Sequence, residues 1–205
     1  MAWLQQNASW ILELMQLAVI SAAAVFAYLQ VKGVRETSSR RSTIEFIRET
    51  ENDNDVIMQR ARFLKLRNSR HNHLAQWIDL QQDREFKLDY IANLCAERTF
   101  SAEDEKQQYV EQLEAEIRDN NEAIRGVLNR YEILAIGIFT RSLDEEMVKR
   151  FQRTTMITDW NKTKEYIEKL RTFTNSPHTF IEFQKLAVQW EAQVLEQDMR
   201  QREIK

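Results

Sequence analysis

The residues best suited to chemistry lie on an apolar stretch that has a helical pattern, residues 124–139. Asn129 and Glu132 are three positions apart in it, so a helix places both side chains on one face. Arg130 and Arg171 could each pair with the Glu132 carboxylate. One interpretation is a small pocket around a carboxylate; the other, which the pattern favours, is a hydrogen-bonded network that fixes helix register. The candidate polar core or pocket comprises Asn129, Glu132, Arg171, Trp160 and Trp190.

A second candidate is a basic stretch that could bind anions. Its five cations fall within eleven residues, and such a cluster suits anionic lipid, an acidic protein surface or nucleic acid. The chain as a whole has a net charge of −3, so a general basic field for nucleic acid is absent. The favoured interpretation is a solvated face that pairs with the acidic segment 103–119. The candidate contact surface comprises Arg60, Arg62, Lys65, Arg67 and Arg70.

The remaining polar residues do not match known catalytic or metal-binding patterns. His71 and His73 are two apart, so a helix would point them in different directions, and Cys95 is the only cysteine. Three glycines cannot form the phosphate-binding loops of nucleotide folds, and no serine or cysteine nucleophile motif is present. We therefore expect no metal and no cofactor, and an enzyme is not favoured.

Residues 10–31 form the clearest signal in the chain. They carry a single charge, Glu13, and as a helix they would extend about 33 Å, which matches a hydrocarbon core of about 30 Å. Trp10 and Tyr28 lie near its two ends, where aromatic rings favour the membrane interface. A buried core helix or a cleavable signal peptide fits this pattern less well. We expect residues 10–31 to contact the lipid bilayer as a single transmembrane helix.

Basic residues predict how this helix is oriented. None precedes it, whereas Lys32, Arg35, Arg40 and Arg41 follow it. The positive-inside rule then places the N-terminus outside and the C-terminal domain in the cytoplasm, at the inner (cytoplasmic) membrane. Pairs of alanines four residues apart within the span, such as Ala18 and Ala22, would also permit a homo-oligomer.

Composition indicates that the rest of the chain is all-α. Gly (3) and Pro (1) are far rarer than average, and 30% of the residues are charged. We expect one N-terminal transmembrane helix followed by a helical bundle-like cytoplasmic domain. The predicted divisions are a short external N-terminus (1–9), the transmembrane helix (10–31), a juxtamembrane helix (32–52), the all-α domain (53–196) and a frayed polar tail (197–205).

Capping signals predict where the helices of the domain begin. Asn52–Asp55 reads as a break before a helix at about 56–67, which is followed by another at about 74–94. Ser101 precedes an acidic helix that leads into the central apolar one. The capping box Ser142–Glu145 predicts a short helix to Arg153, and Thr158 or Asp159 is predicted to cap the next helix. Ser176-Pro177 predicts the start of the final helix. That helix has an apolar seam of Phe180, Phe183, Ala187, Trp190 and Val194.

The central helix and the aromatic C-terminal part resemble a known family. Residues 129–137 read Asn-Arg-Tyr-Glu-Ile-Leu-Ala-Ile-Gly, which is similar to the core pattern N-x-[FY]-E-x-x-A-x-G of domain of unknown function 4760. Trp160, Arg171 and the Leu186-Ala187-x-x-Trp190 segment also resemble that family. The resemblance covers roughly residues 40–195. It implies a helical domain and a prokaryotic or phage origin, and it brings no activity.

Two functions stay open at the level of sequence. The first is a membrane-tethered interaction protein that acts on a protein partner at the inner membrane. The alternative is a membrane-bound enzyme with a carboxylate pocket around Glu132.

Overall fold

The computed structural model describes residues 2–69 and 74–203. Within these ranges the chain forms helices only, as the composition predicts. In chain order they are α1 (Ala2–Asn52), α2 (Asn54–Asn68), α3 (Gln76–Gln82), α4 (Arg84–Ala96), α5 (Glu103–Phe139), α6 (Glu145–Thr174) and α7 (Ile181–Glu203).

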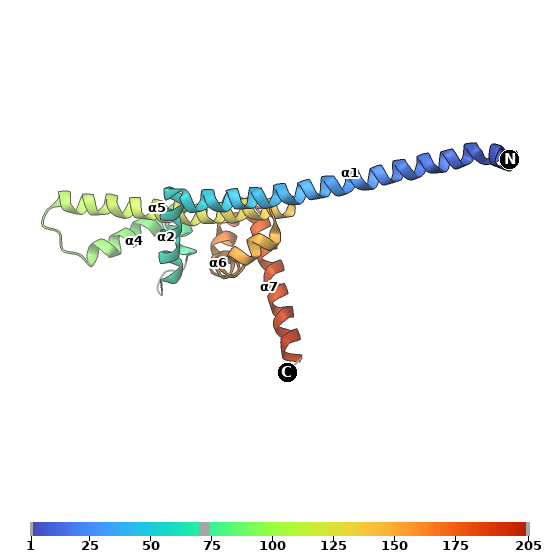
Figure 1. The fold of residues 1–205 in the computed structure, drawn as a ribbon. Helices are drawn as coiled ribbons and strands as arrows, with labels where there is room; N and C mark the ends of the chain where they lie inside the picture. The colour runs from blue at the N-terminus through green and yellow to red at the C-terminus, as the bar shows by residue number, and fades with distance from the viewer. Residues whose placement is uncertain (1, 70–73, 204–205) are drawn as a thin grey trace.

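Helix α1 runs without interruption through the apolar segment and beyond it. Its first half extends away from the rest of the molecule (Figure 1), and its second half contacts α2 and α6. Apolar side chains along the first half, such as Leu17, Val19 and Phe26, are 60–68% exposed. No other part of the described chain covers them, and by its length and composition α1 could cross a membrane.

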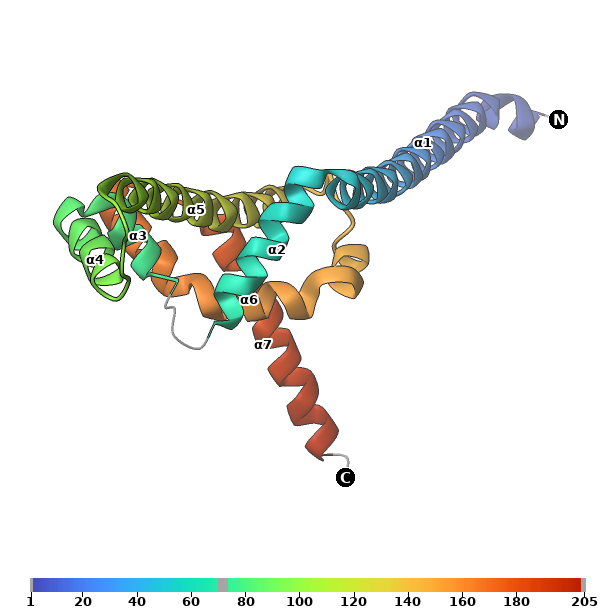
Figure 2. The same ribbon diagram turned by 90° about the vertical axis from the view of Figure 1, so that its left-hand side faces the viewer.

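The predicted break after α1 is confirmed. Helix α1 ends at Asn52, and Asp53 caps α2 by accepting hydrogen bonds from the backbone N–H groups of Asp55 (2.9 Å) and Val56 (3.3 Å). The chain therefore turns sharply at this point, and α2 runs from α1 down across the body (Figure 2).

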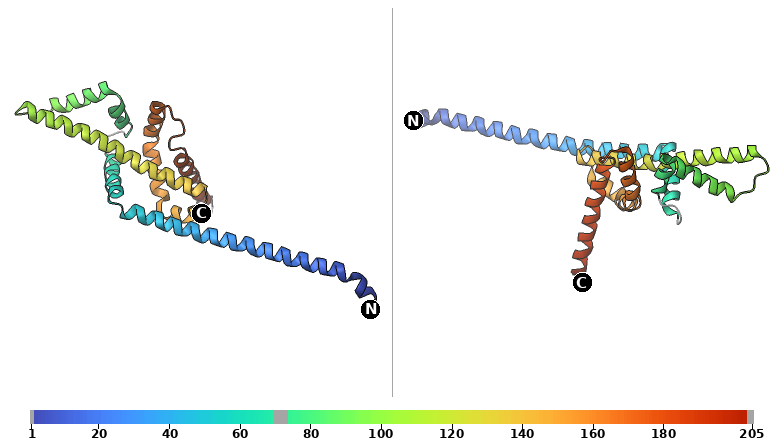
Figure 3. Two further views of the ribbon diagram at one scale, coloured as in Figure 1. Left: turned by 90° about the horizontal axis from the view of Figure 1, so that it is seen from above. Right: turned by 180° about the vertical axis from the view of Figure 1, so that it is seen from behind.

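The prediction of one helix over 74–94 is wrong, since the segment divides at Asp83. This residue has an extended backbone, and its carboxylate accepts a hydrogen bond from the N–H of Phe86 (3.0 Å). Helix α3 ends there and α4 begins. Helix α4 and the first half of α5 then form a hairpin at the end of the body away from the N-terminus (Figure 3), where Lys87 and Glu114 pair at 2.8 Å.

Helix α5 is the central element, as predicted. It packs against α2, α3, α4 and α7. Its apolar second half is buried on one side only, however, because Ile133, Ile136 and Phe139 are 42–57% exposed.

Helix α6 corrects two predictions. It starts two residues later than the capping box implies, because Asp144 rather than Ser142 accepts the hydrogen bond that caps it, from the N–H of Met147 (3.0 Å). It then continues unbroken to Thr174, so neither Thr158 nor Asp159 caps a helix. Ser142 instead donates to the carbonyl oxygen of Gly137 at the end of α5 (3.1 Å).

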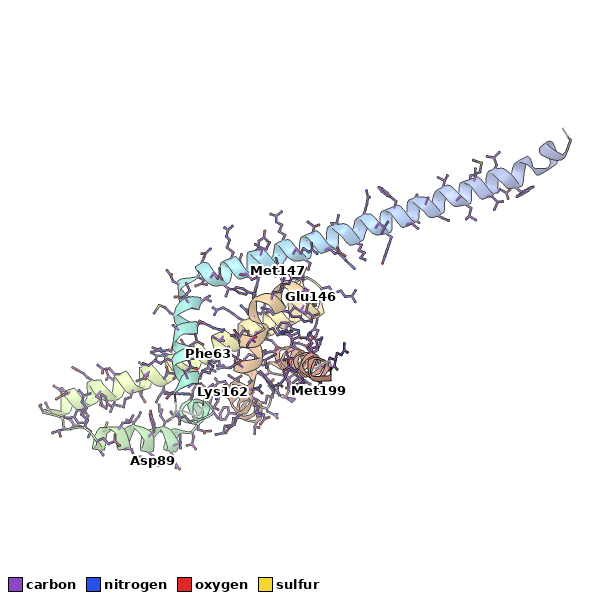
Figure 4. All side chains as sticks on the ribbon, turned by 60° about the horizontal axis from the view of Figure 1, so that its bottom comes forward. Phe63, Asp89, Glu146, Met147, Lys162 and Met199 are labelled. Atoms are coloured by element: carbon purple, nitrogen blue, oxygen red, sulfur yellow. The ribbon has the colours of Figure 1, made fainter. Side chains whose placement is uncertain are left out.

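The start of α6 also ties the domain to α1. The Asp144 N–H donates to the Thr43 hydroxyl (2.8 Å), and the Arg40 guanidinium pairs with the Asp144 carboxylate (3.3 Å). Thr43 is fully buried. Glu146 and Met147, in the first turn of α6, lie close to α1 in Figure 4.

Helix α7 begins later than the Ser176-Pro177 signal predicts. Residues 177–180 form turns, Phe180 has a left-handed backbone (φ 58°), and the helix starts at Ile181. Its first half lies in the core, where Phe183, Ala187 and Trp190 are fully buried as predicted. Its second half projects from the body (Figures 1 and 2) and is helical up to Glu203, although a frayed tail was predicted from residue 197.

Candidate polar core and interaction surface

The strongest polar feature of the domain is a charge cluster around Asp159. This residue lies in the middle of α6 and is fully buried. Its carboxylate pairs with Arg67, with Arg60 (3.4 Å) and with the Tyr131 hydroxyl, which donates a hydrogen bond of 2.6 Å. Arg60 also donates to the Tyr131 oxygen. The cluster thus joins α2, α5 and α6.

Tyr131 is held in its neutral form within the cluster. Burial raises the pKa of its hydroxyl above the usual range, and the negative charge of Asp159 acts in the same direction, against the opposing effect of Arg60. A protonated hydroxyl can donate to Asp159 and accept from Arg60 at once. Each oxygen of the buried carboxylate has a partner, which is what a buried charge requires.

Glu132, the centre of the candidate polar core or pocket, caps the start of α7. One of its oxygens accepts from the N–H of Glu182 (3.2 Å) and the other from the N–H of Phe183 (2.7 Å). The first N–H groups of a helix lack partners within the helix, and a carboxylate placed there also interacts favourably with the helix dipole. Both oxygens are therefore committed to a capping role.

The other residues of the predicted pocket do not converge on Glu132. Asn129 is exposed on α5. Arg171 donates to the carbonyl oxygen of Thr179 (2.9 Å) and to the side chain of Gln184 (2.8 Å), so it fixes the turn before α7. Neither Arg171 nor Arg130 forms the ion pair with Glu132 that the sequence allows. This arrangement agrees with the interpretation of Glu132 and Arg171 as parts of a structural network.

The two tryptophans of the predicted pocket pack around α7. The ring of Trp160 meets Phe183 edge-on, with centroids 5.7 Å apart. Trp190 is fully buried, and its indole N–H donates to Glu145 at the start of α6 (3.0 Å). Burial by itself would raise the pKa of Glu145, but the hydrogen bonds from Trp190 and Lys149 outweigh it, so the pKa lies below its ordinary value of 4.5.

The predicted basic surface is divided between the interior and the exterior of the protein. Arg60 and Arg67 face the buried Asp159, as described above. Arg62 pairs with Asp119 of α5 (2.7 Å), which supports the predicted pairing with the acidic segment. Lys65 is exposed, and Arg70 lies outside the described residues. The described cations therefore do not form one contact surface.

Asp159 and Tyr131 are not predicted as partners from the sequence, although a signal for them exists. Met156, Asp159, Thr163, Tyr166 and Leu170 follow each other at helical spacing, and all are buried. A charged residue within such an apolar stripe indicates a buried ion pair. On α2, Val56, Arg60, Phe63 and Arg67 are spaced by four, three and four residues, so the two arginines share the inward face.

Helix α7 carries an apolar stripe on the face turned away from the core, which begins in its first half and continues along the projecting half. Val188, Leu195 and Met199 are 48–59% exposed, and Ala192 lies between them at the same helical angle. Their spacing of four, three and four residues matches the a and d positions of a coiled-coil seam. Figure 4 views α7 nearly end-on and shows Met199 apart from Phe63, which lies in the core. This stripe is the candidate interaction surface.

Metal ligands do not gather in the part of the chain that the structure describes. Within it, no group of three or more His, Cys, Asp and Glu side chains is arranged to hold an ion. Cys95 is half-buried, and His71 and His73 lie outside the described residues.

Comparison with known proteins identifies a family for the chain. Residues 17–190 match the family described as Domain of unknown function (DUF4760). No curated protein and no solved structure matches the chain. The family match starts inside the apolar half of α1 and ends at Trp190, so it includes more of α1 than the resemblance seen in the sequence. It covers most of the 205 residues, and the chain therefore belongs to the DUF4760 family.

Proposed function

We propose that this protein is a membrane-tethered interaction protein whose α7 docks onto a helix of a protein partner. Residues 10–31 of α1 cross the membrane once, and the helical domain lies on its cytoplasmic side. The observation that carries the docking half of the proposal is the outward apolar stripe Val188, Ala192, Leu195 and Met199 on a helix that projects from the body.

The exposure of α1 supports the membrane half of the proposal. Its most apolar window has a mean hydropathy of 1.8, and none of that window is buried by the rest of the described chain. A core helix of a water-soluble protein of similar composition would be covered by other elements. The helix also continues into the domain, which it holds through Thr43 and Asp144, so a rigid connection would fix the distance between domain and bilayer.

The charges beside the stripe favour a different protein over a second copy. Three carboxylates flank the stripe: Glu191, Glu196 and Asp198. Residues 188–200 contain one cation, Arg200. Two copies of α7 packed stripe to stripe would bring these carboxylates together, and like charges across a helical seam oppose pairing. A partner helix with an apolar seam and basic flanks fits this surface.

Cross-linking from α7 tests the docking proposal. A photoreactive amino acid replaces Leu195 on the stripe or, as the matched control, Gln197, which faces the opposite side of the same exposed helix. In native membranes, we expect a cross-linked product from position 195, little from position 197, and loss of the product when Glu196 and Asp198 are both changed to lysine. Equal products from both faces, no product, or a product formed only with a second copy would contradict the proposal.

Reporter fusions test the orientation. A reporter placed after Lys205 should be active in the cytoplasm, because the basic residues Lys32, Arg35, Arg40 and Arg41 follow the span. A signal from the other side of the membrane would show that the topology is the reverse of the one proposed. A fusion recovered in the soluble fraction would show that α1 does not anchor the protein in the membrane.

A further inference from the structure

A cavity lies at the junction of α1, α2, α5 and α6, next to the Asp159 cluster. Its volume is about 430 Å³, which falls within the usual range for small-molecule sites of about 300–1,000 Å³. Most of its lining is apolar, and each of the four helices contributes, through side chains such as Phe46, Ile57, Leu134 and Phe151. Ile57 and Phe151 are each about half exposed, at 48% and 49%, so an apolar ligand would cover surface that water now contacts.

Two guanidinium groups line the same cavity. Arg60 is committed to Asp159 and Tyr131, as described above. Arg130, by contrast, makes no hydrogen bond or ion pair with any residue that the structure describes. Burial lowers the pKa of Arg130, and the like charge of Arg60 acts in the same direction, while Asp53 partly opposes both. An anion beside Arg130 would relieve an arrangement that now lacks a direct counter-charge.

One carboxylate, Glu51, also lines the cavity, and it forms no ion pair with Arg130. Glu51 is exposed near the end of α1, whereas Arg60 and Arg130 are partly buried beside the apolar wall. Since Arg60 is already paired with Asp159, Arg130 is the partly buried charge of the lining that has no direct counter-ion among the described residues.

We propose that this cavity binds a free single-chain amphiphile with an anionic carboxylate head. The head pairs with Arg130, and the aliphatic chain lies against Phe46, Ile57 and Phe151. The site is separate from the α7 stripe. A ligand bound in it would contact both α1 and the domain at the junction between them.

The distance along α1 favours a free amphiphile over a lipid that remains in the bilayer. If the span ends at Val31, Phe46 lies about 22 Å further along the helix, or about 17 Å along the membrane normal at a tilt of 40°. The headgroup layer on each side of the hydrocarbon core is about 5–8 Å thick. A lipid whose chains lie in the hydrocarbon core of the bilayer could not place one of those chains in the cavity. This choice of source rests on the proposed membrane span; the site itself does not.

Titration of the full-length protein with decanoate tests the proposal. The protein is held in nanodiscs of neutral lipid, and empty nanodiscs give the background from partitioning. We expect saturable binding of one decanoate per chain, with weaker binding of decanol, which lacks the charge. Arg130→Gln should weaken decanoate binding at least about tenfold, while Arg125→Gln, an exposed change on the same helix outside the cavity lining, should not.

A second pair of variants keeps the test independent of Arg130. Ile57→Asp places a carboxylate at the cavity wall and should abolish decanoate binding. Met58→Asp, at the next and more exposed position (70%), should leave it unchanged. Binding no greater than to empty nanodiscs, equal affinity in Ile57→Asp and Met58→Asp, or equal affinity for decanol and decanoate would overturn the proposal. Displacement of decanoate by nanodiscs of anionic lipid would overturn the choice of a free amphiphile. None of these outcomes depends on the α7 partner.

Discussion

Both faces of α2 carry basic side chains, but those on the inner face pair with a buried carboxylate and those on the outer face lie at the surface. Arg60 and Arg67 point inward and surround the buried Asp159, with side-chain exposures of 31% and 16%. Arg62 and Lys65 point outward, and Arg62 pairs with an Asp119 that is 42% exposed. In water a charge pair contributes little, whereas in the core an unpaired charge is costly. Basic residues close together in sequence therefore need not form one binding surface.

The largest effect should follow from removing the buried partner. Asp159→Ala leaves Arg60 and Arg67 without their counter-charge, so we expect a loss of about 3–5 kcal/mol in the free energy of unfolding. The matched control is Asp119→Ala, which removes the surface partner of Arg62 and should cost less than about 1 kcal/mol. Both are measured by chemical denaturation of the full chain in mild detergent. A similar cost for both carboxylates would break the comparison.

Removal of the α7 cap should have an intermediate effect. Glu132→Ala frees the N–H groups of Glu182 and Phe183, and we expect it to cost about 1–2 kcal/mol, in the range of a lost helix cap. Glu122→Ala on the exposed face of α5 serves as the control and should be near neutral. Because helical content would change little, denaturation midpoints are the measurement. If Glu132→Ala leaves the denaturation midpoint unchanged, water replaces the carboxylate at this helix start.

Glu145 should give a smaller effect that depends on pH. Its pKa is lower in the folded protein than its ordinary value of 4.5, so its contribution to stability is present above that value and is lost as the pH falls below it. We expect wild type to be more stable than Glu145→Gln near neutral pH, and the difference to shrink in acid. Parallel stability curves for the two proteins from neutral pH to pH 3 would contradict this assignment.

The smallest effects should come from the outward face of α2. Arg62→Ala and Lys65→Ala each change exposed charges, and we expect the free energy of unfolding to shift by no more than about 0.5 kcal/mol. The same denaturation assay measures them. A cost above about 2 kcal/mol for either would show that the outward face is also part of the core.

Local signals in the sequence predicted much of the fold but little of the polar core. The break at Asn52–Asp55 and the seam of α7 depend on neighbours within a few residues, so the sequence reveals them directly. Asp159 follows Thr158 and looks like a helix cap. Its true partners, Arg67 and Tyr131, lie 92 and 28 residues away, and only the folded chain brings them together.

The start of α7 was misplaced for a related reason. Ser176-Pro177 has the composition of a helix start, yet the N–H groups of the first turn are satisfied by Glu132, fifty residues earlier on α5. The same long-range contact explains the role of Glu132, whose carboxylate could have belonged to a pocket but caps a helix instead. The long apolar helix α1, in contrast, depends on composition alone and was predictable without any tertiary contact.

A double-mutant cycle tests the division of α2 most directly. Arg67→Ala and Asp159→Ala are combined in one cycle, and Arg62→Ala and Asp119→Ala in a second. Contacting residues in a network show coupling energies of about 0.5–3 kcal/mol, and exposed pairs about 0.2–1 kcal/mol. We predict coupling of about 2–3 kcal/mol between Arg67 and Asp159, and less than about 1 kcal/mol between Arg62 and Asp119. Equal coupling energies in the two cycles would contradict the account.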